Sequence, residues 1–130
     1  MSSPGIWLSG AAVASGAAIG ALGRWGAAVL LNHRWPAFPL GTLLVNLLGG
    51  LLVGVAVVCL QHRPYGSVHL FVLTGVLGGF TTFSAFSAES LALIGRGQWL
   101  LAAAHTLAHV FGALVCAALG AAAARAVVAA

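Results

Sequence analysis

The sequence predicts an all-α membrane protein with four transmembrane helices. The chain has 130 residues, of which 62% are hydrophobic and only 5% are charged, whereas a soluble domain carries roughly 25% charged residues. Four apolar runs separated by short polar breaks reach the length of about 20 residues that a bilayer span needs. So little polar surface excludes soluble enzymes, nucleic-acid binders and disordered tails, and the lipid bilayer becomes the natural solvent.

The four runs define a single four-helix transmembrane domain over residues 1–130. The spans are predicted at about residues 6–31, 40–60, 68–94 and 99–124. Prolines 36 and 39 fall in the first break, a polar Gln-His-Arg-Pro segment at 61–64 starts the second, and the Gly-Arg-Gly-Gln turn at 95–98 forms the third. Connections this short make neighbouring helices antiparallel.

The charges do not select one orientation in the membrane. Arg63 and Arg125 fall on one side of the predicted bundle, and Arg34 and Arg96 fall on the other. Because the positive-inside rule depends on an excess of basic residues on one side, two readings remain. Either a small protein simply has few charges, or the chain inserts both ways up or pairs with an oppositely oriented partner. Four short helices enclose little interior, so a pore would need an oligomer.

Small residues four apart predict close helix packing. They occur in the first, second and fourth spans, as Gly16 and Gly20, as Gly50 and Gly54, and as Gly112, Cys116 and Gly120. In the second span Thr42 and Asn46 prolong the glycine stripe. The Asn46 amide must find partners inside the membrane. It either bonds a neighbouring helix or lines a polar path.

The third span is expected to be a broken helix. Gly78 and Gly79 are followed by Thr81 and Thr82 near its middle. Glycine permits non-helical backbone, and threonine competes for backbone hydrogen bonds. Irregular backbone at this depth survives only where it is buried or lines a cavity, and its freed carbonyls can bind cations.

A stripe of aromatic side chains follows this point. Its members recur every third residue and are expected on one face: Phe80, Phe83 and Phe86, with Ser84 and Ser87 beside them. Glu89, the only acidic residue of the chain, comes next. Such a stripe is usually core or lipid-facing. Its interleaving with hydroxyls also suits a small anion, because the edge of a phenyl ring is positive.

Three segments resemble the CrcB/Fluc family of fluoride channels: residues 23–25 (Gly-Arg-Trp), 41–46 (Gly-Thr-Leu-Leu-Val-Asn) and 78–89, from Gly78 to Glu89. The resemblance implies a dual-topology dimer of antiparallel chains, either a homodimer or a pair with a paralogous CrcB subunit. It implies two fluoride pathways per dimer and passive export of fluoride across the cell membrane, which protects the cytoplasm. A multi-pass membrane channel of this kind is not an enzyme.

The resemblance also implies roles for individual residues. Phe83 and Phe86 would contact fluoride with their ring edges, and Asn46 and Thr42 would donate hydrogen bonds to it. Arg24 would draw anions into a vestibule, and Glu89 would lie near the far end of the polar track. A structural Na⁺ on the dimer axis would be held by the backbone carbonyls of Gly78 and Thr81. Independently of the resemblance, the hydroxyls of Ser84 and Ser87 are further donors that can replace the water shell of fluoride.

The fourth helix departs from the family pattern. Family members often carry Tyr, Ser and Ser where this chain has His105, His109 and Ala113. As a metal site the two histidines lack a third ligand on the same helix. They are either hydrogen-bonded packing residues or replacements for hydroxyl donors that make conduction pH-sensitive, because histidine titrates near neutrality.

Two other functions remain as alternatives. Small multidrug transporters are also four-helix, dual-topology proteins, but they rely on a glutamate in the first helix, and this first span has no acid. A non-conducting partner subunit of a heterodimeric channel is the second alternative. The absence of lysine agrees with an anion pore, since a conducting site must hold its ion weakly enough to release it.

Overall fold

The computed structural model describes residues 3–35 and 37–130, and the regular secondary structure of these residues is entirely helical, without strands. Pro36, part of the predicted first break, lies outside the described residues. The elements are α1 (Ser3–Leu31), η1 (Asn32–Arg34), α2 (Leu40–Leu60), α3 (Ser67–His69), η2 (Leu70–Leu77), α4 (Gly78–Phe80), α5 (Phe83–Gly95) and α6 (Trp99–Val128). Four stretches are long and apolar enough to cross a membrane, which confirms the four predicted spans.

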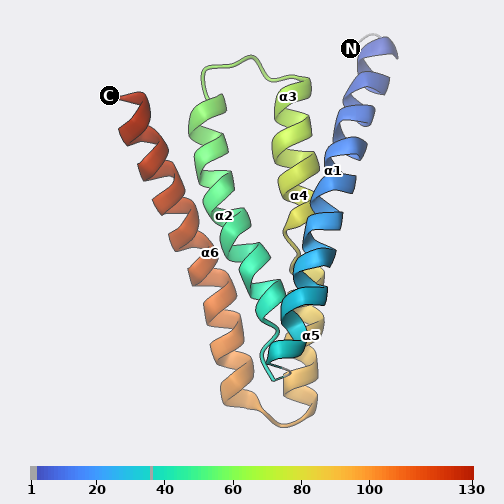
Figure 1. The fold of residues 1–130 in the computed structure, drawn as a ribbon, viewed down its shortest axis with the longest axis vertical. Helices are drawn as coiled ribbons and strands as arrows, with labels where there is room; N and C mark the ends of the chain where they lie inside the picture. Colours follow the sequence, from blue (N-terminus) through green and yellow to red (C-terminus); the bar gives the residue numbers. More distant parts are fainter. Residues whose placement is uncertain (1–2, 36) are drawn as a thin grey trace.

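The helices alternate in direction along the chain (Figure 1). Both termini and the connection between α2 and α3 lie at one end, and the α1–α2 and α5–α6 connections lie at the other. Two helix pairs dominate the packing: α2 runs along α6, and α1 runs along η2 and α4. The loop arginines are therefore divided evenly between the two ends, as the sequence predicts.

Glycines let the backbones of α2 and α6 approach closely. A Cβ atom added at Gly50 would lie 2.6 Å from the carbonyl oxygen of Ala113, and one at Gly54 would lie 2.8 Å from the amide nitrogen of Ala121. On the other side of the molecule, a Cβ at Gly16 would lie 2.5 Å from the carbonyl oxygen of Phe71. These contacts are tighter than any side chain allows, so small residues set the helix spacing.

Replacing Gly54 by alanine is expected to lower the free energy of unfolding by about 1–3 kcal/mol, the usual cost of forcing an extra group into a close-packed contact. Gly10→Ala in α1 is the matched control, because a Cβ there meets nothing within 4 Å and alanine favours the helix by up to about 1 kcal/mol. Denaturant unfolding in detergent, followed by circular dichroism, measures both. Equal stability of the two variants would contradict the packing described.

The third span is interrupted at Thr81 and Thr82. Helix α4 ends at Phe80, and α5 begins at Phe83. Between them the backbone is extended, with φ −79° and ψ 156° at Thr81 and φ −147° and ψ 117° at Thr82. Before the interruption η2 is π-helical, a rare form that is frequent at functional sites. Gly78 and Gly79 remain helical, so the threonines and not the glycines leave the helix.

The interruption corrects one expectation about the aromatic stripe. Phe80 lies before the break and Phe83 after it, so the three phenylalanines do not share one helix face. The Phe80 ring lies between α1 and α2, because Cβ atoms added at Gly23 and at Gly49 would lie 3.3 Å and 3.6 Å from it. Phe83 and Phe86 remain neighbours on α5, with ring centroids 5.2 Å apart. The physical reason is that the extended threonines reset the helical phase between Phe80 and Phe83.

Candidate functional site

Asn46 joins α2 to the interruption of the third span. Its Oδ1 accepts a hydrogen bond of 2.8 Å from the Thr82 backbone N–H, and its Nδ2 donates one of 3.0 Å to the Thr82 carbonyl. The Asn46 amide thus satisfies both backbone groups of a residue that has left the helix. Thr82 also begins α5, because its hydroxyl accepts a hydrogen bond from the Ala85 N–H at 3.1 Å. A buried backbone break needs such partners to be stable.

The same amide fixes the orientation of His109 on α6. Asn46 Nδ2 lies 2.9 Å from His109 Nδ1. Because the Thr82 contacts determine which end of the amide is nitrogen, Asn46 is the donor and Nδ1 the acceptor. Neutral His109 therefore keeps its hydrogen on Nε2. Nε2 is buried and makes no hydrogen bond within the described chain, so an N–H donor is left available for another group.

Glu89 lies closer than Thr82 to the α5–α6 connection. Its Oε1 accepts a short hydrogen bond of 2.6 Å from the Thr42 hydroxyl, and its Oε2 lies 3.3 Å from His105 Nε2. The other nitrogen of that ring, Nδ1, lies 3.0 Å from the Ser90 hydroxyl. The His105 side chain is fully buried. Thr42, Glu89 and His105 therefore form one polar group that connects α2, α5 and α6.

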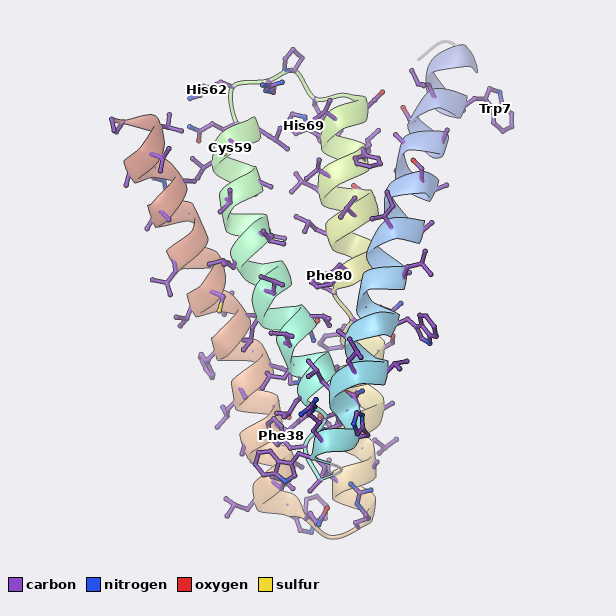
Figure 2. The ribbon with its side chains drawn as sticks, viewed as in Figure 1. Trp7, Phe38, Cys59, His62, His69 and Phe80 are labelled. Atoms are coloured by element: carbon purple, nitrogen blue, oxygen red, sulfur yellow. The ribbon has the colours of Figure 1, made fainter. Side chains whose placement is uncertain are left out.

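Aromatic rings surround the two histidines. The Phe86 ring centroid lies 4.9 Å from that of His109 and 5.5 Å from that of His105. Phe38 covers His105 from the α1–α2 connection at 5.1 Å, and Figure 2 labels it near that end of the molecule. Phe86 is buried, whereas Phe83 is 77% exposed. Packing thus fixes the Phe86 ring, whereas the Phe83 ring extends from the surface of the chain.

A cavity of about 430 Å³ opens beside these groups. Asn46, Thr82, Phe83, Phe86 and His109 are among the residues that line it, together with apolar side chains of α2 and α6. The polar lining is restricted to hydroxyl, amide and imidazole groups, and no lysine or arginine contributes to it. This environment suits a small anion that is stabilised by N–H and O–H donors and by ring edges.

The structure does not bring every predicted site residue into this group. Arg24 on α1 donates a hydrogen bond of 3.1 Å from its Nε to the Gly79 carbonyl, on the other side of the interruption. Ser84 and Ser87 lie on the exposed side of α5. The Ser84 hydroxyl lies 3.2 Å from that of Thr82, and Ser87 donates to the Phe83 carbonyl at 2.8 Å. Arg24 and Ser87 are therefore outside the buried polar residues within one chain, whereas Ser84 reaches them through Thr82 and Phe83 lines the cavity.

Three residues of the site were not singled out as site residues by the sequence. The sequence indicates Thr82 only as part of the break, because its pairing with Asn46 depends on how α2 is placed. Ser90 and Phe38 contact His105 from different elements. The sequence around Ser90 does not indicate that its partner is His105. Phe38 lies between two prolines, where a phenylalanine is typical of any loop.

The backbone near the interruption offers carbonyl oxygens. In a continuous helix the Thr82 N–H would bond to Gly78 O, but it donates to Asn46 instead. Thr81 has extended backbone, so its own carbonyl has left the helical pattern. Exposed carbonyls of this kind are suitable ligands for a hard monovalent cation. The residues Gly78 and Thr81 therefore fit a sodium ion chemically.

Comparison with known proteins gives one consistent result. Residues 11–121 match the family described as "CrcB-like protein, Camphor Resistance (CrcB)". A protein of Thiobacillus denitrificans named "Fluoride-specific ion channel FluC" is 44% identical over 111 residues, which cover 84% of this chain and 90% of the relative. Proteins with the same name from Aromatoleum aromaticum and Cupriavidus pinatubonensis are 48% and 49% identical over 84% of this chain, and the matches cover 85% and 88% of those relatives.

Proposed function

The chain belongs to the CrcB family, and we propose from this membership and from the site that it is a fluoride-selective channel of the cell membrane. Fluoride leaves through it passively, down its gradient, so that its concentration in the cytoplasm falls and its toxicity is reduced. The observation that supports this most is the group of donors and ring edges at the cavity: Asn46, His109, Phe83 and Phe86 around the interruption at Thr82. A channel of this kind performs transport and no catalysis.

Fluoride must exchange most of its water shell for protein groups as it passes. His109 Nε2–H supplies one donor beside the cavity, and the Asn46 amide holds that ring in place. The edges of Phe83 and Phe86 add weak positive potential without basicity. Because no lysine or arginine lines the cavity, the ion is not trapped, which conduction requires. Thr42 and Glu89 continue the polar path toward the α5–α6 end.

The complete pathway is formed by two antiparallel chains. Phe83, Ser84 and Ser87 are exposed on a single chain, although each suits an ion pathway better than contact with lipid. A second chain would cover them and close the path. The even division of loop arginines permits insertion in both orientations, so a homodimer needs no second gene product. A paralogous CrcB subunit in place of the second copy is the alternative.

A sodium ion at the dimer interface would be held by the carbonyls of Gly78 and Thr81 from both chains. The ion supplies positive charge that offsets carbonyl groups left without helical partners at the interruption. The Gly78 carbonyl is left without its helical hydrogen bond, because the Thr82 N–H donates to Asn46 instead. The adjacent Gly79 carbonyl already accepts a hydrogen bond from Arg24 and is therefore not among the proposed ligands.

Growth of a fluoride-sensitive bacterium tests the proposed role in the cell. We expect expression of this chain alone to restore growth in medium with fluoride, in a strain that lacks its own exporter. Protection should not extend to toxic organic cations, which a small multidrug transporter would remove. Rescue only when a paralogous CrcB subunit is co-expressed would identify the chain as half of a heterodimer, and no rescue in either case would contradict the proposal.

A further inference from the structure

Three side chains that can ligate a metal ion meet between α5 and α6. Glu89 comes from α5, and His105 and His109 lie one turn apart on α6. Each offers one ligand atom, and these three atoms lie within 4.8 Å of one another. Both histidines are at least nine-tenths buried, with 0% and 5% of their surface exposed. The third ligand that the sequence of α6 does not contain is therefore supplied by a neighbouring helix.

Each of these side chains has one polar atom occupied and one polar atom free. The occupied atoms are paired with neighbouring helices: Glu89 Oε1 with Thr42, His105 Nδ1 with Ser90, and His109 Nδ1 with Asn46. The free atoms are Glu89 Oε2, His105 Nε2 and His109 Nε2, which are buried and make no hydrogen bond to residues 3–35 or 37–130. A hydroxyl partner at the far nitrogen, as His105 has in Ser90, is the arrangement that orients metal-ligating histidines in proteins. His109 differs, because Asn46 donates to its far nitrogen.

The ligand set fits a transition metal of the Zn²⁺ class. Two imidazole nitrogens and one carboxylate oxygen are ligands that zinc accepts, and such three-ligand sites keep a fourth position open. Ligand bonds of about 2.0–2.2 Å in a tetrahedral shell place the ligand atoms about 3.3–3.6 Å apart. Glu89 Oε2 and His105 Nε2 are already separated by 3.3 Å. Because all three ligand atoms lie within 4.8 Å of one another, the remaining pairs need to approach by no more than about 1.5 Å.

Charge also favours a cation at this point. Glu89 is the only acidic residue of the chain, and a carboxylate in a membrane-spanning helix is costly unless it is paired. Thr42 satisfies one oxygen, and the other lies 3.3 Å from His105 Nε2, which would neutralise the carboxylate only as a cation. A divalent ion would compensate the second oxygen and both free imidazole nitrogens at once, whereas a water molecule would leave the charge in place.

We propose that Glu89, His105 and His109 bind one divalent transition-metal ion of the Zn²⁺ class, and that the bound ion blocks fluoride conduction. The second part rests on the proposed function. The ion would take the Nε2 of His109, the atom that otherwise offers a hydrogen to fluoride, and it would lie beside the Phe86 ring. Ligation moves the His109 hydrogen to Nδ1, where it faces the donor group of Asn46, so that hydrogen bond is lost. We therefore expect a Zn²⁺ affinity about 10- to 100-fold lower than that of a site whose histidines all have an acceptor at the far nitrogen.

Metal binding is tested first, without any transport. Purified protein in detergent is titrated with ZnCl₂ by calorimetry, and with CoCl₂ by visible absorption, which reports the ligand geometry. We expect one ion per chain and no response to Mg²⁺, which prefers oxygen ligands. His109→Ser and Glu89→Gln should each weaken Zn²⁺ binding at least about 100-fold, more than the loss of an outer partner causes. His62→Gln, in the exposed α2–α3 connection, is the control and should bind as the unmodified protein does.

Fluoride efflux from liposomes then tests the block. Saturating Zn²⁺ should stop efflux through the unmodified protein and through His62→Gln, and chelation should restore it. If the unmodified protein binds no Zn²⁺, or if His109→Ser binds it equally well, the site is disproved. Binding without any effect on efflux would overturn the block alone. A protein that binds Zn²⁺ and never conducts fluoride would contradict the proposed function and leave the metal site supported.

Discussion

Asn46→Asp is expected to abolish fluoride efflux. The change replaces an NH₂ group that donates to the Thr82 carbonyl and to His109 Nδ1 by a carboxylate oxygen, which donates to neither. It also places a negative charge beside an anion pathway. The repelled anion also loses the positioned His109 donor, and we expect flux to fall more than about 100-fold, which corresponds to about 3 kcal/mol on the barrier. The rate is measured with a fluoride electrode outside liposomes that contain the purified variant.

Asn32→Asp is the matched control for this experiment. Asn32 Oδ1 accepts hydrogen bonds from the backbone N–H groups of Gly41 and Thr42, at 2.7 and 3.3 Å. A carboxylate accepts the same bonds and is favourable at the start of a helix. Asn32→Asp should therefore keep most of the flux although the chemical change is identical. An Asn46→Asp protein that elutes normally in detergent and conducts at the unmodified rate would remove Asn46 from the pathway.

Phe83→Ile is expected to slow fluoride efflux by roughly 10-fold. Isoleucine keeps the bulk of the side chain but has no aromatic edge, and an aromatic contact contributes about 0.5–1.5 kcal/mol beyond its buried area. Because Phe83 is 77% exposed on the chain, its replacement removes the contact with the Phe86 ring but leaves the buried hydrogen bonds of Asn46 and His109 in place. The same liposome assay gives the rate.

Phe111→Ile on α6 controls for the loss of an exposed ring, because Phe111 is 59% exposed and does not line the cavity. Its efflux should equal that of the unmodified protein. If Phe83→Ile also conducts at the unmodified rate, the exposed ring plays no part in the pathway. If Phe111→Ile is equally slow, the loss of flux reflects a general effect on the membrane-embedded chain.

The fold was predictable because a bilayer leaves few alternatives. Backbone groups in lipid must be satisfied within helices or closed barrels, so four long apolar runs with short breaks specify four alternating helices. The stripe of Gly50 and Gly54 indicated a close helix contact for the same reason, since only small residues allow it. The threonines at 81 and 82 marked the region of the interruption, although the neighbouring glycines stayed helical.

The contacts between helices were not predictable from one sequence. Nothing in the spacing of Asn46 indicates that its amide pairs with Thr82, and nothing in α6 indicates that Glu89 lies beside His105. Such pairs depend on the relative rotation and height of helices, which small residues permit but do not specify. The three-residue period of the phenylalanines gave a wrong result for Phe80, because a period describes one face only while the helix continues.

Two copies of this chain, without any other kind of subunit, are proposed to form a fluoride-selective pathway. The most direct measurement is efflux from liposomes that contain only this purified protein and equal concentrations of fluoride and chloride, followed by electrodes specific for each ion. We expect fluoride to leave rapidly while chloride remains inside, and Asn46→Asp to remove the fluoride signal. Release of both ions at similar rates, or fluoride release no faster than from protein-free liposomes, would contradict the claim.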